Sequence, residues 1–315
     1  MLNGKSDYGT AAGHVACNIS GPRRFKSGSI RDHVLGFRGV NGKGDIIKSG
    51  GTVVKNVTGY DLSKLVTGSF GTLTALTEIT FKVLPKKDSI STLVIYLEDN
   101  KIISNLFDQL LSSSNEISGA VYMSVEPNNK NYTKNIEKIF KFNNLKSEEP
   151  FVAIRIEGSK KSIDERIQDI SQEIQTNKMK TSILDFYQSK LFWEKVNNLE
   201  LFSGTKNNLL RAGIPPATSL DLMKYLKNDF KYYIDWCGSL FWIEVLEEEN
   251  IQIKEMKETI INLGGYLTIV KKSESLSSDI DLFTINDTRL LLSQKIKESF
   301  DPKKLLNPGK MYRGL

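Results

Sequence analysis

A repeated order of apolar strands and polar helices between residues 89 and 272 constrains the fold of this chain more than any other feature. The first half runs as strand 91–97, helix 100–113, strand 120–126, strand 151–158, helix 159–177 and strand 180–186. The second half runs as strand 208–216, helix 219–228, strand 231–236, strand 239–246, helix 250–264 and strand 265–272. The strands are short, alternating or continuous apolar runs, and the helices are rich in Lys and Glu. Each half therefore has the order β-α-β-β-α-β.

Two successive units of this order predict an α+β fold with two ferredoxin-like halves. Their antiparallel sheets are expected to join into one larger sheet with the helices on one face. The other face needs a cover, and Trp236, Phe241 and Trp242, with the edge segment 210–216, are candidates for it or are simply core. Between 126 and 151 we expect a polar loop, and 187–199 is an amphipathic segment.

The first 85 residues have a different texture, with short apolar stretches broken by glycines. Asn41-Gly42 predicts a hairpin with a tight primed turn, because both central residues of such a turn need positive φ. Further on, Gly59, Gly68 and Gly71 precede an alternating strand that stops at Pro85. Glycine is costly inside an element, so these positions indicate special backbone geometry or the close approach of a ligand.

Several kinds of chemistry are missing from the sequence. It contains neither a G-x-x-x-x-G-K-[ST] phosphate loop nor a G-x-G-x-x-G turn after a strand. With only two histidines, His14 and His33, and two cysteines, Cys17 and Cys237, we expect no zinc site, iron–sulfur cluster, disulfide framework or histidine triad. Freed backbone N–H groups at glycines form anion cradles, so a nucleotide or dinucleotide site is one hypothesis, and plain glycine-rich turns are the alternative.

The formal net charge is +6, from 43 Lys and Arg against 37 Asp and Glu. Lysines are interleaved with acidic residues and do not alternate with aromatics, so we favour a solvated lysine-rich surface over a nucleic-acid platform. No apolar run reaches the roughly 20 residues needed to cross a bilayer, and residues 1–10 lack the apolar core of a signal peptide. We expect a cytoplasmic protein, with peripheral attachment to the inner membrane through partners as the alternative.

A long, ordered set of motifs resembles the second half of the FAD-binding domain of the vanillyl-alcohol-oxidase type, also called the PCMH type. The motifs are SGPRR, IRDHVLG, KNVTGYDLSKL, GSFGTL and EITFKVLP in the first 85 residues, then LRAGIPP, WCGSLFWIEV and FDPKKLLNPGKMY. More narrowly, the chain resembles the FAD-binding E subunit of bacterial glycolate oxidase. The resemblance covers essentially the whole chain and is weakest between about residues 99 and 206.

The resemblance implies FAD as cofactor and assigns its binding residues. Residues implied to pass the diphosphate and the flavin are Thr10, Gly13, Ala16, Cys17 and Asn18. Residues implied to lie beside the flavin ring system are Gly59, Tyr60, Asp61, Gly68, Gly71 and Thr72. The backbone of Ile79 is implied to meet the adenosine end, and Asn307 and Lys310 belong to the tail that returns to the flavin.

The same resemblance implies a division of the chain and a function. Residues 1–88 would be the second part of the PCMH-type domain, 89–275 a cap of the substrate-binding type, and 276–315 a helix and tail that return to the FAD domain. The function implied is that of an FAD-binding subunit of a glycolate-oxidase-like complex, which moves a hydride from a 2-hydroxy acid such as glycolate or D-lactate to the flavin. Expected partners are a D-type flavoprotein and an iron–sulfur subunit. The alternative is a non-catalytic scaffold subunit of such a complex with flavin binding lost or weakened.

Two departures from the family pattern affect these expectations. Nothing in the sequence corresponds to the first FAD subdomain of the family, so we expect a chain truncated at its N-terminus that holds half of a dinucleotide site. No histidine follows His33, so the family's H-x-G-D-G-N-x-H metal motif is missing and no metal is expected. Arg211 is the candidate contact for a substrate carboxylate, and no other catalytic residue is assigned.

Overall fold

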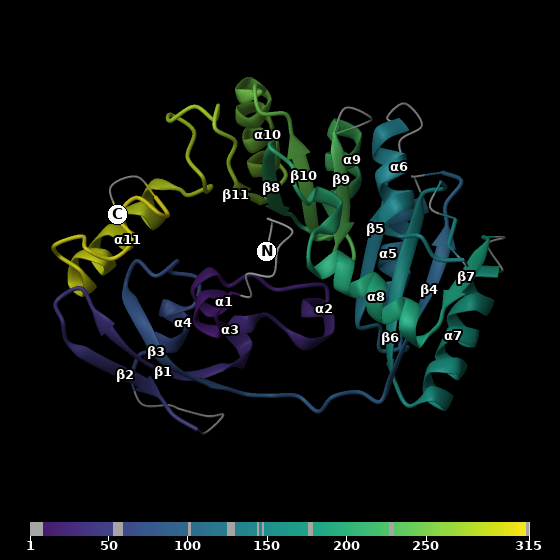
Figure 1. Cartoon of the computed structure of the whole chain (residues 1–315), viewed down its shortest axis with the longest axis horizontal. Helices are drawn as coiled ribbons and strands as arrows, with labels where there is room; N and C mark the ends of the chain where they lie inside the picture. Colours follow the sequence, from purple (N-terminus) through teal and green to yellow (C-terminus); the bar gives the residue numbers. More distant parts are fainter. Residues whose placement is uncertain are drawn as a thin grey trace. The chain divides into compact units, whose positions relative to one another are not determined.

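The computed structural model describes residues 9–52, 59–99, 102–124, 130–143, 145–146, 148–175, 179–226, 230–312 and 315. Residues 55–58 of the glycine-rich stretch and the ends of several predicted helices and strands lie outside these ranges. The chain divides into two units, described here one at a time (Figure 1). The large unit comprises Pro22–Ser27 and Lys86–Ile280, and the small unit comprises 9–21, 28–85 and Asp281–Leu315.

The large unit contains one antiparallel sheet, in which the described strands follow the order β11-β8-β10-β9-β5-β6-β4-β7. Its strands are β4 (Ser89–Tyr96), β5 (Gly119–Met123), β6 (Phe151–Gly158), β7 (Thr181–Leu184), β8 (Asn208–Gly213), β9 (Lys231–Asp235), β10 (Leu240–Val245) and β11 (Tyr266–Lys271). Its helices are α2 (Arg24–Ser27), α5 (Ile102–Ser112), α6 (Lys130–Ile139), α7 (Lys160–Gln175), α8 (Phe186–Asn197), α9 (Ser219–Leu226) and α10 (Asn250–Asn262), with 3-10 turns at Glu200–Phe202 and Pro216–Thr218.

The strand order confirms the two predicted ferredoxin-like halves. In each half the first and third strands lie in the centre and the second and fourth lie outside, as β5-β6-β4-β7 and β11-β8-β10-β9 show. The halves join through their second strands, where Tyr122 of β5 lies opposite Ile234 of β9 and Met123 opposite Tyr233. The predicted single sheet is therefore present.

The second face of this sheet is covered by a helix that follows the first half. α8 begins with a capping box, in which Asp185 accepts a hydrogen bond from Gln188 N at 2.9 Å. Its Phe192 and Trp193 are buried in one cluster with residues of β4, β5 and β6. Trp236, Phe241 and Trp242 are all buried, which confirms the interpretation of these three residues as core.

The prediction of a polar loop between 126 and 151 is wrong, because helix α6 lies in this part of the chain. Polar composition hid this helix, but Ile136 and the following Phe140 are fully buried in the same cluster as Phe192. Burial of a few apolar side chains thus decided the conformation of an otherwise polar segment.

A short segment from the glycine-rich N-terminal region, Pro22–Ser27, packs as part of the large unit, which the sequence did not predict. Arg23 forms an ion pair with Glu157 at 3.3 Å, and Lys26 forms one with Glu116 at 3.0 Å. Between them, Arg24 lies with its Cζ 4.2 Å from the centre of the Trp236 ring. Two ion pairs, from Arg23 and Lys26, and one cation–π contact, from Arg24, therefore hold the segment.

The small unit contains an antiparallel sheet of the described strands β2 (Ile46–Gly50), β1 (Val34–Asn41) and β3 (Thr74–Phe81), in that order. The predicted hairpin at Asn41-Gly42 is present, but the predicted two-residue turn is wrong. Four residues join β1 and β2, and the Asn41 side chain accepts hydrogen bonds from the amides of Lys43 and Asp45, both at 2.9 Å. In this turn Gly44, not Gly42, has the positive φ, of 89°.

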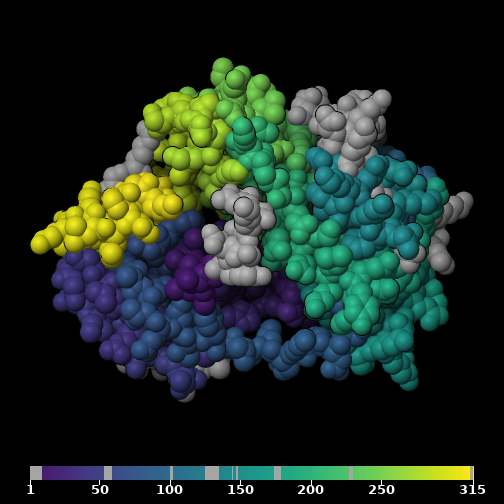
Figure 2. Space-filling view, in the orientation of Figure 1, coloured from purple at the N-terminus to yellow at the C-terminus, as the bar shows by residue number. Residues whose placement is uncertain are grey.

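The helices of the small unit are α1 (Ala11–Cys17), α3 (Ile30–His33), α4 (Leu62–Val66) and α11 (Asp287–Phe300). Asn286 caps α11 by accepting a hydrogen bond from Arg289 N at 2.9 Å. Figure 2 shows the yellow atoms of α11 and the tail directly against the blue and purple atoms of residues 28–85. Gly42 N donates to Phe300 O at 3.0 Å at this junction.

Within the parts of the chain that the structure describes, no helix is both long and apolar enough to cross a bilayer.

One ionisable side chain lies deep in the large unit, at the end of β9. Asp235 is only 2% exposed, and its carboxylate accepts a hydrogen bond from Trp236 N at 2.7 Å. Burial raises the pKa of Asp235 to about 7, although that hydrogen bond and the charge of Arg211 act in the opposite direction. In the unfolded chain the pKa returns to about 4.

Replacing Asp235 with Asn should change how stability depends on pH. Between about pH 4 and pH 7 the folded protein keeps a proton that the unfolded chain has released, so the free energy of unfolding falls as pH rises through this window. We expect Asp235→Asn to remove this fall, which amounts to at most about 4 kcal/mol. Urea unfolding at several pH values measures it, with the exposed Asp221→Asn as control. Parallel pH profiles for wild type and Asp235→Asn would contradict the prediction.

Candidate functional site

Three segments of the small unit meet at one place, which we call the glycine–tail cluster: the end of α1 (15–18), the loop 68–72 and the tail 305–311. The loop is tied to α1 by two backbone hydrogen bonds. Gly68 N donates to Val15 O at 3.0 Å, and Phe70 N donates to Ala16 O at 2.8 Å. Backbone pairing thus brings together two glycine-rich motifs that lie about fifty residues apart in the sequence.

Helix α1 positions the first group of predicted site residues. Thr10 is its N-cap, and its hydroxyl accepts a hydrogen bond from Gly13 N at 3.0 Å. Asn18 ends the helix in the left-handed conformation, with φ of 49°, and its N–H donates to Val15 O at 3.1 Å. Asparagine tolerates this conformation better than most residues, which explains why it stands at the C-cap.

The side chain of Asn18 contains an unsatisfied polar atom. Its Oδ1 is buried, and no donor among the described residues reaches it. Gly68 lies directly beside it with φ of 86°, and a Cβ on Gly68 would stand 3.3 Å from the Asn18 Cβ. A buried carbonyl oxygen without a hydrogen-bond partner lowers the free energy of unfolding by about 1–3 kcal/mol. Its position next to a glycine therefore indicates an acceptor for a hydrogen bond from a ligand.

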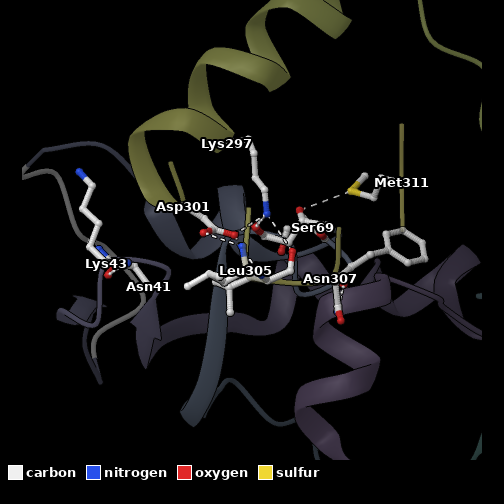
Figure 3. Close-up of polar contacts among 11 residues, drawn as sticks. Asn41, Lys43, Ser69, Lys297, Asp301, Leu305, Asn307 and Met311 are labelled. Carbon is white, nitrogen blue, oxygen red and sulfur yellow. Dashed lines mark hydrogen bonds and ion pairs between the residues drawn. The ribbon is translucent and has the colours of Figure 1, made fainter. Parts of the chain in front are cut away.

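The tail is fixed to the loop by a buried ion pair at the end of α11 (Figure 3). Lys297 Nζ donates to Asp301 Oδ2 at 2.7 Å, to Thr72 O at 2.7 Å and to Leu306 O at 2.8 Å. Lys297 is 2% exposed and Asp301 is fully buried. An ammonium group has three protons, and here each has a partner: Asp301 at the end of α11, Thr72 in the loop and Leu306 in the tail.

Asp301 completes this arrangement by binding the start of the tail. Its Oδ1 accepts a hydrogen bond from Leu305 N at 3.0 Å, and its Oδ2 accepts one from Leu306 N at 2.7 Å. Burial opposes ionisation, but the hydrogen bonds from Lys297, Leu306 and Leu305 hold the pKa of Asp301 below its usual range. A Cβ on Gly42 would overlap the Asp301 carboxylate, so the glycine of the hairpin motif is required for packing.

The tail places Asn307 and Lys310 on the loop. Asn307 Nδ2 donates to Phe70 O at 2.8 Å, and a Cβ on Gly71 would come within 2.8 Å of the same nitrogen. Thr72 is buried, and its hydroxyl donates to Ser69 O at 2.7 Å and lies 3.8 Å from the Met311 sulfur. Gly71 is therefore glycine both because the tail amide needs the space and because its φ is 69°.

Cys17 and Lys310 are near enough to affect one another. Burial raises the pKa of the Cys17 thiol, and the positive charge of Lys310 partly opposes this rise. The thiol is therefore neutral near pH 7, and Lys310, whose side chain is exposed, contributes a positive charge at the edge of the cluster.

Four predicted residues of the small unit lie elsewhere. Gly59 and Tyr60 precede α4, and Asp61 caps it by accepting a hydrogen bond from Lys64 N at 3.2 Å. Tyr60 is 93% exposed. Ile79 lies on β3 opposite Phe37 of β1. Among the hydrogen bonds and ion pairs of the described residues, none joins these four to the glycine–tail cluster.

Arg211, the candidate carboxylate contact, belongs to the large unit. It lies on β8, opposite Trp242 of β10 and Thr268 of β11. Its Nε is buried without a hydrogen-bond partner among the described residues, and its Cζ lies 5.0 Å from the centre of the Trp236 ring. Burial lowers the pKa of Arg211, and contact with Tyr266 opposes this effect.

Lys297, Asp301 and Gly42 were missed as site residues in the sequence. A Lys and an Asp four residues apart on a helix are the usual pattern of an exposed pair, so spacing gave no sign of burial. The one available signal was their position immediately before the turn-rich tail.

Comparison with known proteins gives both relatives and a fold. No protein-family model matches the chain. It is 30% identical over 308 residues to the glycolate oxidase subunit GlcE of Escherichia coli (strain K12), and the match covers 97% of this chain and 73% of GlcE. It is 25% identical over 329 residues to the glycolate oxidase subunit GlcD of Bacillus subtilis (strain 168), covering 96% of this chain and 68% of GlcD.

Among solved structures, p-cresol methylhydroxylase with bound substrate is similar, with a TM-score of 0.60 and 14% identity. The match covers 88% of this chain, which spans 64% of the length of that one. At this identity the likeness concerns the fold alone, and it confirms the predicted PCMH-type α+β fold.

Removing the buried ammonium should destabilise the small unit. Lys297→Met leaves Asp301 charged and buried, and it also leaves two carbonyl oxygens without their donor. Breaking a buried ion pair in this way costs about 3–5 kcal/mol. Guanidinium unfolding measures the loss, and Lys295→Met, an exposed lysine on the same helix, is the matched control. Equal stability of the two variants would show that the ion pair does not hold the tail.

Proposed function

We propose that this chain, which belongs to the family of the glycolate oxidase subunit GlcE, binds FAD as one subunit of a complex that oxidises 2-hydroxy acids. The observation that carries the proposal is the buried, unpartnered Oδ1 of Asn18 beside Gly68. It stands in the motif that the family resemblance assigns to the flavin.

The residues present fit a flavin dinucleotide in three respects. Asn18 offers an acceptor for an N–H group of the ring system, and Gly68 and Gly71 supply the positive φ that shapes the loop beside it. Lys310 supplies a positive charge for the diphosphate or for a reduced flavin. We propose these residues, with Thr10, Gly13, Ala16, Cys17, Thr72 and Asn307, as the side of the FAD site that this chain contributes.

The other assigned residues of the small unit belong to the same proposal. Gly59, Tyr60 and Asp61 form an exposed turn before α4, where a ligand surface is accessible. The backbone of Ile79 is proposed for the adenosine end. Whether these four residues contact the same molecule as the glycine–tail cluster is tested by the FAD titration below, extended to a Tyr60→Ala variant.

When bound, FAD supplies the acceptor for a hydride from the α-carbon of the substrate. The task of this chain is to hold and orient the two reactants. Arg211 is proposed to bind the substrate carboxylate, because its buried Nε has a free donor and its charge is only weakly compensated. D-type and iron–sulfur subunits are the proposed partners; the relative named glycolate oxidase subunit GlcD supports the first, and the second comes from the family resemblance alone.

Removing the Asn18 amide should weaken FAD binding without loosening the fold. Asn18→Gly keeps the left-handed backbone, whose φ is 49°, while it removes the acceptor. We expect about a tenfold or greater loss of FAD affinity, since one hydrogen bond to a buried group is worth about 1–3 kcal/mol. Quenching of flavin fluorescence on titration of the 315-residue chain measures the affinity.

Glu116→Gly is the matched control, because it removes another side chain at a left-handed position, with φ of 47°, in the large unit. Equal FAD affinity of Asn18→Gly and wild type would exclude Asn18 from the site. A wild-type chain that takes up no FAD would support the alternative of an assembly subunit, whose reconstituted complex should keep full activity with Asn18→Gly.

A further inference from the structure

The large unit contains a pocket of about 400 Å³ at one end of the sheet, where β8 ends, β11 begins and the turn from β9 leads to β10. All of its lining residues belong to this unit. Those that bear on its chemistry are Arg24, Leu111, Ile214, Pro215, Trp236 and Tyr266. The volume is within the range of sites that bind small molecules.

Two guanidinium groups lie near the ring of Trp236, which lines the pocket; Arg24 is itself a lining residue, and Arg211 is not. Arg24 Cζ lies 4.2 Å from the centre of the Trp236 ring, and Arg211 Cζ lies 5.0 Å from it. They are close enough that the charge of Arg24, together with burial, disfavours the charged form of Arg211. Bringing two like charges together is costly unless an opposite charge stands with them.

The residues around Arg24 and Arg211 do not supply a full negative charge to balance these two guanidinium groups. Among the described residues, no carboxylate forms an ion pair within 4.0 Å with either guanidinium. The nearest acidic influence on Arg211 comes from Asp235, which is buried and titrates near pH 7, so its charge is only partly present under neutral conditions. Tyr266 contributes a hydroxyl rather than a charge. The pocket is therefore electropositive and suited to an anion.

Part of the pocket wall is apolar. Leu111 is 44% exposed and lines the pocket, as do Ile214 and Pro215 just after the end of β8. Tyr266 is also 44% exposed and forms part of the rim. Glycolate, with only two carbons, would leave most of this space and all of this wall unfilled. A ligand that uses the whole pocket has an anionic head and an apolar chain.

We propose that this pocket binds a 2-hydroxy acid with an apolar side chain of several carbons, its carboxylate on Arg24 and its chain against Leu111, Ile214 and Pro215. The proposal rests on the proposed function for the substrate class, because the 2-hydroxy group comes from there. It adds Arg24 as a binding residue and predicts a preference for substrates longer than glycolate.

Direct binding to the 315-residue chain, without turnover, tests the proposal. The ligands are glycolate, 2-hydroxybutanoate, 2-hydroxyhexanoate and the uncharged 1,2-hexanediol, measured by calorimetry and by tryptophan fluorescence. We expect binding to tighten about two- to fourfold for each added methylene, since burial of a methylene is favourable. We expect the diol to bind at least tenfold more weakly than 2-hydroxyhexanoate.

Two variants distinguish the anion-binding part of the pocket from its apolar part. Arg24→Gln keeps much of the side-chain length and should weaken every acid at least tenfold while leaving the diol unchanged. Leu111→Asn should weaken 2-hydroxyhexanoate and leave glycolate unchanged. Lys224→Ala, an exposed cation on α9 of the same unit, is the matched control, and it should bind all four ligands as wild type does.

Several results would overturn the proposal: no binding of any acid, equal affinity for glycolate and 2-hydroxyhexanoate, equal affinity for the acid and the diol, or full acid binding by Arg24→Gln. These titrations require no flavin. A chain that binds 2-hydroxyhexanoate but not FAD therefore refutes the proposed function alone, and a chain that binds FAD but none of the acids refutes the pocket alone.

Discussion

The small unit depends on a single buried ammonium. Lys297 links Asp301, the carbonyl of Thr72 and the carbonyl of Leu306, so one side chain joins α11, the loop 68–72 and the tail. Asp301 then fixes the amides of Leu305 and Leu306. Because every proton of the ammonium has an acceptor, the cost of burying the charge is offset locally. The position of Asn307 on the loop follows from this arrangement.

Buried charged groups are arranged differently in the large unit. Arg211 and Asp235 lie within the same sheet, yet neither has an ion-pair partner among the described residues. In the small unit, buried charges satisfy each other and hold segments together. In the large unit, Arg211 and Asp235 are left partly unsatisfied, which is the usual condition of groups that act on a ligand.

Sequence patterns predicted the regular parts of this fold because burial of alternating apolar residues acts locally along each strand. The two β-α-β-β-α-β halves follow from such patterns. The failures were features decided by distant contacts. Helix α6 depends on burial of Ile136 and Phe140, and Gly42 is needed because Asp301, far along the chain, occupies the space beside it. The loops at 15–18 and 68–72 and the tail were each expected at the site, but no pattern predicted the ion pair that joins them.

Hydrogen exchange of individual backbone amides in Asp301→Asn tests most directly whether the ion pair holds the whole cluster. The amides of Gly68 and Phe70 make no contact with Asp301, because they donate to Val15 and Ala16 of α1. We expect them to lose protection together with the amides of Leu305 and Leu306, because removal of the charge releases Lys297 from the loop as well as from the tail. Loss of protection confined to Leu305 and Leu306 would contradict the central claim and show that the loop is held by α1 alone.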